Sequence, residues 1–193
     1  VSFPQSVVWA LLGCVASFAI SIVTERVNGT YLRLRISPLT RARILAGKAL
    51  ACLVASSVVV AVLLVVGKVA FGVRIESPTG LLAAILCSSA CFVGIMMLLS
   101  TLGKTQAAVG GAGWAILLVM SMLGGGMIPL LFMPSWMRTA SMFSPVRWAV
   151  LSIEGAIWRG FAAAEMLLPC AILVAVGAAC FAFGAYRLRR ADG

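Results

Sequence analysis

Histidine is absent from this 193-residue sequence, and aspartate and glutamate together number only five. General acid–base catalysis relies mainly on histidine and on paired carboxylates, and a metal bound by cysteines here would lack a histidine or a nearby acid to complete its coordination. The few acids are scattered along the chain: they are Glu25, Glu76, Glu154, Glu165 and Asp192. We therefore expect that the chain is not an enzyme, that it has no catalytic residue, and that it binds neither a metal nor a cofactor itself.

Charged residues make up only 10% of the sequence, whereas hydrophobic residues make up 63%. A soluble globular domain is about one quarter charged. All six cysteines lie in apolar runs, where they are expected to pack as small hydrophobes without disulfides. The net charge of +10 does not indicate a nucleic-acid partner, because the sequence offers no basic face on a soluble domain. The composition predicts an all-α membrane protein without a soluble domain.

Five apolar runs are long enough to cross a bilayer, which takes roughly 20 helical residues. None of these runs contains a charged residue. They are residues 7–23, 49–67, 81–102, 107–128 and 166–186. We predict five transmembrane helices that form a single transmembrane domain over residues 1–193.

The basic residues are divided unevenly between the two sides of these predicted spans. Ten of the 15 lysines and arginines lie on the side that holds residues 24–48 and the C-terminus, and five lie on the other side. Lysine and arginine are enriched in cytoplasmic loops. We therefore expect a multi-pass protein of the plasma membrane, the inner membrane in bacteria, with its C-terminus in the cytoplasm and Val1 outside. A preceding inside-to-outside span would deliver Val1 to that face, so we expect an upstream span to be missing.

The stretch "TERVNGTYLRLRISPLTRARILAGK", residues 24–48, separates the first two predicted spans. Its apolar residues alternate with arginines, which suits a segment lying at the headgroup surface. Ser37 followed by Pro38 has the form of a helix N-cap and first helical residue. We expect a short cytoplasmic segment there, followed by a helix that continues from Pro38 into the second span.

Two blocks of this sequence resemble the type-2 ABC transporter permeases, the membrane subunits of ATP-driven exporters. The first block lies within residues 24–48. There an acid is followed, in this order, by Gly-Thr, a basic leucine-rich segment, Ser-Pro and Gly-Lys. The second block is "GGGMIPLLFMPSWMRTASMFSPVRWAVLSIEGAIWRG", residues 124–160. The resemblance covers essentially the whole chain and implies the C-terminal five spans of a six-span permease.

The resemblance also implies partners. A separate ABC ATPase subunit would bind ATP and Mg, a second permease copy would complete a homodimer or heterodimer, and membrane lipids would surround both. The cytoplasmic segment would act as a coupling helix on the ATPase. Carried over position by position, the ATPase contact falls on Glu25, Arg26, Asn28, Gly29, Thr30, Arg33 and Arg35. The plainer interpretation is that the arginines only set orientation and bind anionic lipid, at about 1 kcal/mol each.

Residues 124–160 combine glycines, prolines and tryptophans in a way that breaks a helix at membrane depth. Irregular backbone there is tolerated only against protein or a watery cavity. We predict a re-entrant outer hairpin, with a short helix over 134–142 and a second helix capped by Ser144 and Pro145. Arg147 and Glu154 share a face of that second helix and belong either to the gate or to ordinary interface contacts. The gate candidates are Gly124, Gly125, Gly126, Pro129, Pro134, Trp136, Pro145 and Glu154.

The predicted function is that of a permease subunit of an ABC exporter, with hydrophobic or amphipathic molecules of the drug, lipid or glycan class as substrates. A role in multidrug resistance fits substrates of that class. A secondary transporter or channel is the alternative, but it normally places an ionisable residue within a span. A membrane enzyme acting on lipid-linked substrates would need the acid–base pair that the sequence lacks.

Overall fold

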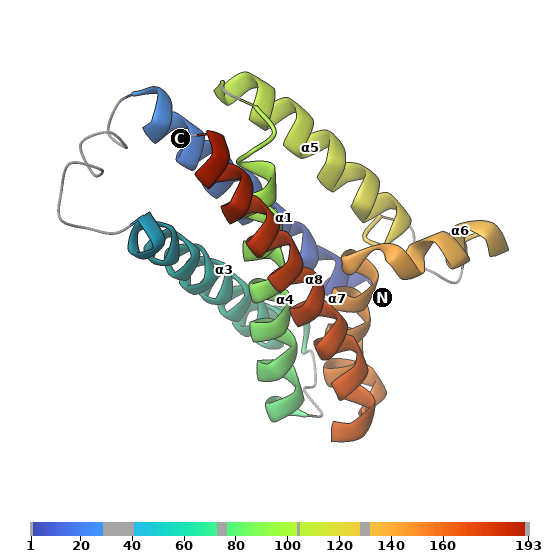
Figure 1. Cartoon of the computed structure of the whole chain (residues 1–193). Coiled ribbons are helices and arrows are strands. Elements are labelled where there is room, and N and C mark those ends of the chain that lie inside the picture. The colour runs from blue at the N-terminus through green and yellow to red at the C-terminus, as the bar shows by residue number, and fades with distance from the viewer. Residues whose placement is uncertain (1, 29–40, 73–76, 104, 128–131, 192–193) are drawn as a thin grey trace.

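The computed structural model describes residues 2–28, 41–72, 77–103, 105–127 and 132–191. Within these ranges no strand occurs. The elements in chain order are α1(Ser2–Val27), α3(Arg41–Phe71), α4(Pro78–Leu99), α5(Gln106–Leu123), α6(Ser135–Ala140), η2(Ser141–Phe143), α7(Pro145–Glu154), η3(Gly155–Arg159) and α8(Ala163–Ala191) (Figure 1). Here η2 is a 3-10 turn and η3 is a π-helical turn. The predicted all-α class is confirmed.

Five of these helices, α1, α3, α4, α5 and α8, are long and apolar enough to cross a membrane. They match the five predicted spans, although several ends differ. The fourth predicted span ran to residue 128, whereas α5 ends at Leu123 because the glycine turn begins at the next residue. The predicted helix start at Pro38 lies outside the described residues, and α3 is described from Arg41.

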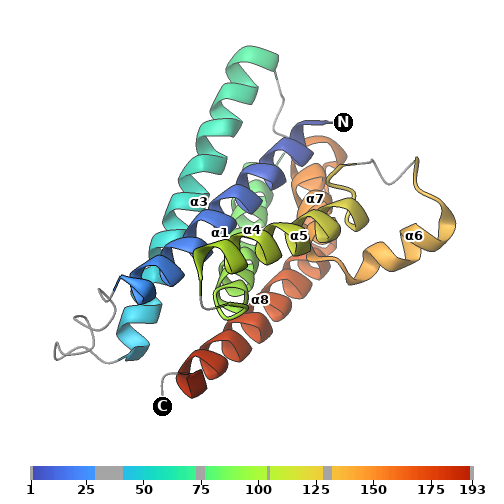
Figure 2. The same ribbon diagram turned by 90° about the horizontal axis from the view of Figure 1, so that it is seen from above.

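Helix α4 is the centre of the bundle and contacts α1, α3, α7 and α8. Two thirds (67%) of its most apolar window is buried, compared with 22% for each of α3, α5 and α8. Figures 1 and 2 show α3, α5 and α8 arranged around α1 and α4. The outer helices therefore leave wide apolar faces for lipid or for another protein chain.

The contact between α4 and α8 is the most extensive helix pair and depends on glycines. A Cβ atom added to Gly94 of α4 would collide with the backbone oxygen of Gly177 of α8. A Cβ atom on Gly177 would lie 2.7 Å from the Cα of Cys91, and one on Gly184 would lie 2.7 Å from the carbonyl carbon of Met97. Glycine lets helix backbones approach closely in membranes, where close packing drives association.

The bundle has two distinct ends (Figures 1 and 2). One end holds the C-terminal ends of α1 and α8 and the N-terminal ends of α3 and α5. The other end holds the N-terminal end of α1, the C-terminal end of α3, the N-terminal end of α4, and α6. The exposed cations Arg43 and Arg190 belong to the first end, and Lys68 and Arg138 to the second. We call these the coupling end and the hairpin end.

Candidate functional site

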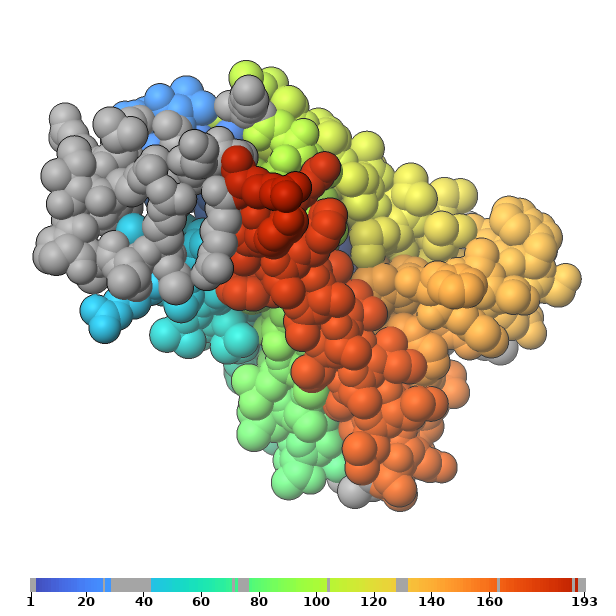
Figure 3. All heavy atoms as spheres, viewed as in Figure 1, coloured from blue at the N-terminus to red at the C-terminus, as the bar shows by residue number. Residues whose placement is uncertain are grey.

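The chain between α5 and α8 folds back into the bundle at the hairpin end. Helix α7 contacts α1, α4, α5 and α8, four of the five spanning helices. Its residues Val146, Ala149, Val150 and Ile153 are all buried. Helix α6 instead projects from the bundle, as Figure 3 shows in yellow and orange, and Trp136 on it is 68% exposed. Helix α7 is therefore packed among the spanning helices, and the re-entry of the hairpin into a bilayer stays a prediction.

The three glycines 124–126 form a tight turn at the end of α5. Gly124 lies so close to the start of α7 that an added Cβ would be 2.6 Å from the Cβ of Val146 and 2.8 Å from the backbone nitrogen of Arg147. Gly125 has φ +85°, which favours glycine. The Gly126 N–H donates to the Ser121 carbonyl at 2.8 Å. Larger residues would push the hairpin away from α5.

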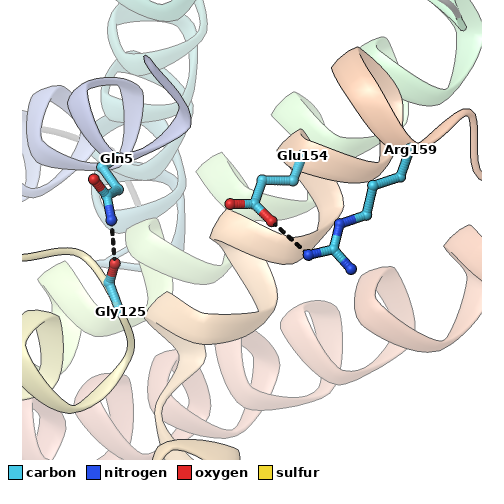
Figure 4. A network of polar contacts seen from close by, with 4 residues as sticks. All are labelled: Gln5, Gly125, Glu154 and Arg159. Atoms are coloured by element: carbon cyan, nitrogen blue, oxygen red, sulfur yellow. Dashed lines mark hydrogen bonds and ion pairs between the residues drawn. The ribbon is translucent and has the colours of Figure 1, made fainter. Parts of the chain in front are cut away.

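Two side chains from the first turns of α1 hold this glycine turn. The Gln5 side-chain amide donates to the Gly125 carbonyl at 2.9 Å (Figure 4), and the Trp9 indole N–H donates to the Gly126 carbonyl at 3.0 Å. The partners are 120 and 117 residues apart in sequence. Neither Gln5 nor Trp9 was among the predicted site residues. The available signal was a glutamine and a tryptophan, both with side-chain hydrogen-bond donors, near the start of a mostly apolar helix.

The hairpin serine was expected to cap its own helix, and that expectation is wrong. Pro145 does occupy the first turn of α7, but the Ser144 side chain makes no cap hydrogen bond. Its hydroxyl instead donates to the Met120 carbonyl of α5 at 2.7 Å. Pro134 stands directly before α6, as predicted for the first short helix. Pro129 lies outside the described residues.

Arg147 and Glu154 find separate partners rather than acting as one charged pair. The Arg147 guanidinium donates to the Arg138 carbonyl at 2.8 Å and to the Ser141 hydroxyl at 2.6 Å. Glu154 forms an ion pair with Arg159 at 3.2 Å (Figure 4). Each charged group thus contacts its own neighbours, while the Arg147 Nε is buried without a hydrogen-bond partner among the described residues. Whether these residues belong to a gate or make ordinary interface contacts stays a prediction.

A π-helical turn follows α7 in the chain and is hydrogen-bonded to the residue that precedes α4. The turn η3 ends at Gly160, which has φ +55°. Phe161 then folds back over Gly155, and its N–H donates to the Gly155 carbonyl at 3.0 Å. The Ser77 N–H donates to the Ala156 carbonyl at 3.2 Å, so the hairpin and α4 are tied together. Single π turns occur frequently at functional sites.

A pocket of about 430 Å³ lies beside this turn, between the first turns of α4 and α8. Its volume falls in the usual range for small-molecule sites. Its walls are mostly apolar, with two hydroxyl groups among them. The lining residues are Ser77, Thr79, Gly80, Ala83, Phe161, Met166, Leu167 and Cys170. The pocket was not predicted from the sequence, because its residues come from segments that are separated along the chain.

At the coupling end, the structure describes part of the predicted ATPase contact. Glu25 lies in the last turn of α1, and Asn28 directly follows that helix and is exposed. For Arg26 only the helical backbone is described. Gly29, Thr30, Arg33 and Arg35 lie outside the described residues. The Glu25 carboxylate pairs with the Lys48 ammonium of α3 at 2.5 Å, a partner that the sequence analysis had not assigned.

Comparison with known proteins adds an independent finding. The family profile described as ABC-2 type transporter matches residues 6–158. The chain is 27% identical to the Linearmycin resistance permease protein LnrN of Bacillus subtilis over 169 residues, which cover 88% of this chain and 44% of the relative. It is 26% identical to the Probable multidrug ABC transporter permease YbhR of Escherichia coli over 137 residues, which cover 70% and 37%.

The chain therefore spans less than half the length of these curated relatives. No solved structure matches it.

Proposed function

The chain belongs to the ABC-2 type transporter family, and on that premise we propose that it is the permease subunit of an ABC exporter. In this proposal a separate ATPase subunit binds ATP with Mg²⁺, and the permease moves a substrate out of the cytoplasm. The observation that carries the proposal is the family match over residues 6–158, which covers four spanning helices and the hairpin.

We propose a hydrophobic or amphipathic substrate. The predicted spans contain no charge, and the pocket beside η3 has apolar walls with a few hydroxyls. The names of the two relatives refer to resistance against linearmycin and to multidrug transport. These observations favour a drug-like or lipid-like cargo over an ionic one.

Helix α1 is proposed to carry motion from the coupling end to the hairpin end. Gln5 and Trp9 bind the glycine turn near its start, and Glu25 binds α3 near its end. The 20 residues from Gln5 to Glu25 span roughly 30 Å at a rise of about 1.5 Å each, the thickness of a hydrocarbon core. A push on the cytoplasmic segment would thus reach the hairpin through one continuous helix.

A secondary transporter remains the second candidate function, but the described contacts favour it less. Such a protein normally holds an ionisable group within a span as its ion or proton site. The two ion pairs among the described residues lie at the ends of the bundle: Glu25 with Lys48, and Glu154 with Arg159. Copurification of an ATPase separates the two candidates.

We propose that a second permease copy completes the transport path.

We also propose that the coupling end faces the cytoplasm of a bacterial cell. Thr79, at the hairpin end, and Arg190, at the coupling end, are both exposed. In full-length protein without its native cysteines, Thr79→Cys should react with an impermeant maleimide on intact cells. Arg190→Cys should react only after the membrane is opened. Labelling of both positions on intact cells would contradict this orientation.

The proposed function is tested by purification of the full-length protein from its native membrane. We expect an ABC ATPase subunit to copurify in a fixed ratio with the tagged permease and to hydrolyse ATP. An unrelated tagged membrane protein from the same cells is the control. A permease preparation that transports substrate in response to an ion gradient without any ATPase would support the secondary transporter instead.

A further inference from the structure

One ion pair among the described residues joins two spanning helices. It connects Glu25, two residues before the end of α1 at Val27, to Lys48 in the second turn of α3. These two helix ends flank the cytoplasmic segment that was predicted to contact the ATPase. The pair therefore lies at the base of that segment, where the chain leaves one spanning helix and enters the next.

Both charged side chains are mostly shielded from solvent. The Lys48 side chain is 20% exposed and the Glu25 side chain is 29% exposed, with 2.5 Å between ammonium nitrogen and carboxylate oxygen. Fully exposed pairs contribute little because water and salt screen them. In a pair that is mostly shielded and this close, the two opposite charges attract each other more strongly than in a fully exposed pair. Removal of one partner would leave the other charge poorly solvated.

The helical register of α3 explains why Lys48 is the partner. Residues three and four apart lie on the same helix face. Leu45 and Cys52, on either side of Lys48 at these spacings, are both buried in the bundle core. Lys48 is therefore presented toward α1, whereas Arg43 on the same helix is exposed. The helical register of α3 thus places this lysine, and not the exposed Arg43, against the acid at the end of α1.

We propose that the Lys48–Glu25 pair is a brace that fixes the separation of α1 and α3 at the base of the cytoplasmic segment. This inference rests on the proposed function, and it makes Lys48 a positioning residue for coupling. One carboxylate oxygen of Glu25 contacts Lys48, and in this proposal the effect of Glu25 on the ATPase passes through the brace rather than through a direct contact. When ATP closes the ATPase, the brace makes α1 and α3 move together.

Charge reversal separates the brace from a direct ATPase contact. Full-length permease variants Glu25→Lys, Lys48→Glu and the double reversal are assembled with the ATPase in vesicles. Each single reversal should lower the amount exported per ATP hydrolysed by about tenfold, and the double reversal should recover to within about threefold of wild type. Bound ATPase should stay near the wild-type level in all three.

Arg43→Glu is the matched control. It makes the same charge change on the same helix at an exposed position, so its export per ATP should stay within about threefold of wild type. Lys48→Arg keeps the charge and should also stay near wild type. A double reversal no better than the worse single reversal, or an Arg43→Glu loss equal to that of Lys48→Glu, would overturn the brace.

A failure of the proposed function gives a different result. If no ATPase subunit accompanies wild-type permease, the exporter assignment fails, while the brace is still measured by thermal unfolding of the permease alone. The single reversals should then lower the unfolding temperature and the double reversal should restore it. Equal unfolding temperatures for all variants in that measurement would contradict the brace itself.

Discussion

A Gly177→Leu variant is expected to accumulate at less than roughly one tenth of the wild-type level, because its α4–α8 contact cannot form. The Gly177 backbone lies against Cys91 and Ala90 of α4, and an added Cβ would be 2.7 Å from the Cys91 Cα and 3.0 Å from the Ala90 oxygen. Backbone atoms cannot rotate away as a side chain can. The helices must therefore separate, which should cost more than the roughly 1–3 kcal/mol of ordinary overpacking.

Ala178→Leu is the control, since Ala178 is the next residue on α8 and is exposed. Its leucine would face lipid and should leave the amount of protein unchanged. Accumulation is measured by immunoblot of membranes and by the monodispersity of the purified protein. Equal accumulation of the Gly177→Leu and Ala178→Leu variants would show that the close α4–α8 approach is not needed.

A Gly124→Val variant is expected to insert normally and to lose at least about tenfold in transport. The valine would collide with Val146 and with the backbone nitrogen of Arg147, both in the first turn of α7. Helix α7 would shift relative to α5, and the Ser144 hydrogen bond to the Met120 carbonyl would break. The spanning helices themselves keep their sequence, so insertion should be unaffected.

Gly111→Val, within α5, is the control substitution of the same type, because an added Cβ there meets no atom within 4 Å. Both variants replace a glycine by valine, but only Gly124 lies against the first turn of α7. Transport is measured as accumulation of a fluorescent apolar compound in cells that express the full-length protein. Wild-type transport by the Gly124→Val variant would mean that the hairpin only packs against the bundle.

The spans were predictable from the sequence because each is a long apolar run without charge. The end of α5 was less predictable, since apolar residues continue after Leu123. The glycines at 124–126 were noted, yet the hydropathy of Met127 and Ile128 extended the predicted span. Length and hydropathy locate a membrane helix well and its ends poorly, because the end depends on turn geometry.

The contacts between distant elements could not be predicted. Helices that are apolar all round carry no face that indicates their neighbour. Glu25 was identified as important, but its contact with Lys48 depends on the packing of α1 against α3. The Gln5 and Trp9 contacts with the glycine turn likewise join residues more than 110 positions apart. Sequence patterns locate the elements, and helix packing selects the partners.

The central claim is that ATP hydrolysis in a partner subunit drives export through this permease. The direct measurement uses vesicles that contain the purified full-length permease with its copurified ATPase, and it follows a fluorescent apolar compound across the membrane. Transport should require ATP and Mg²⁺ and should disappear when the ATPase subunit carries a substitution that permits ATP binding but not hydrolysis. Equal transport without ATP, or with the hydrolysis-deficient ATPase, would contradict the exporter account.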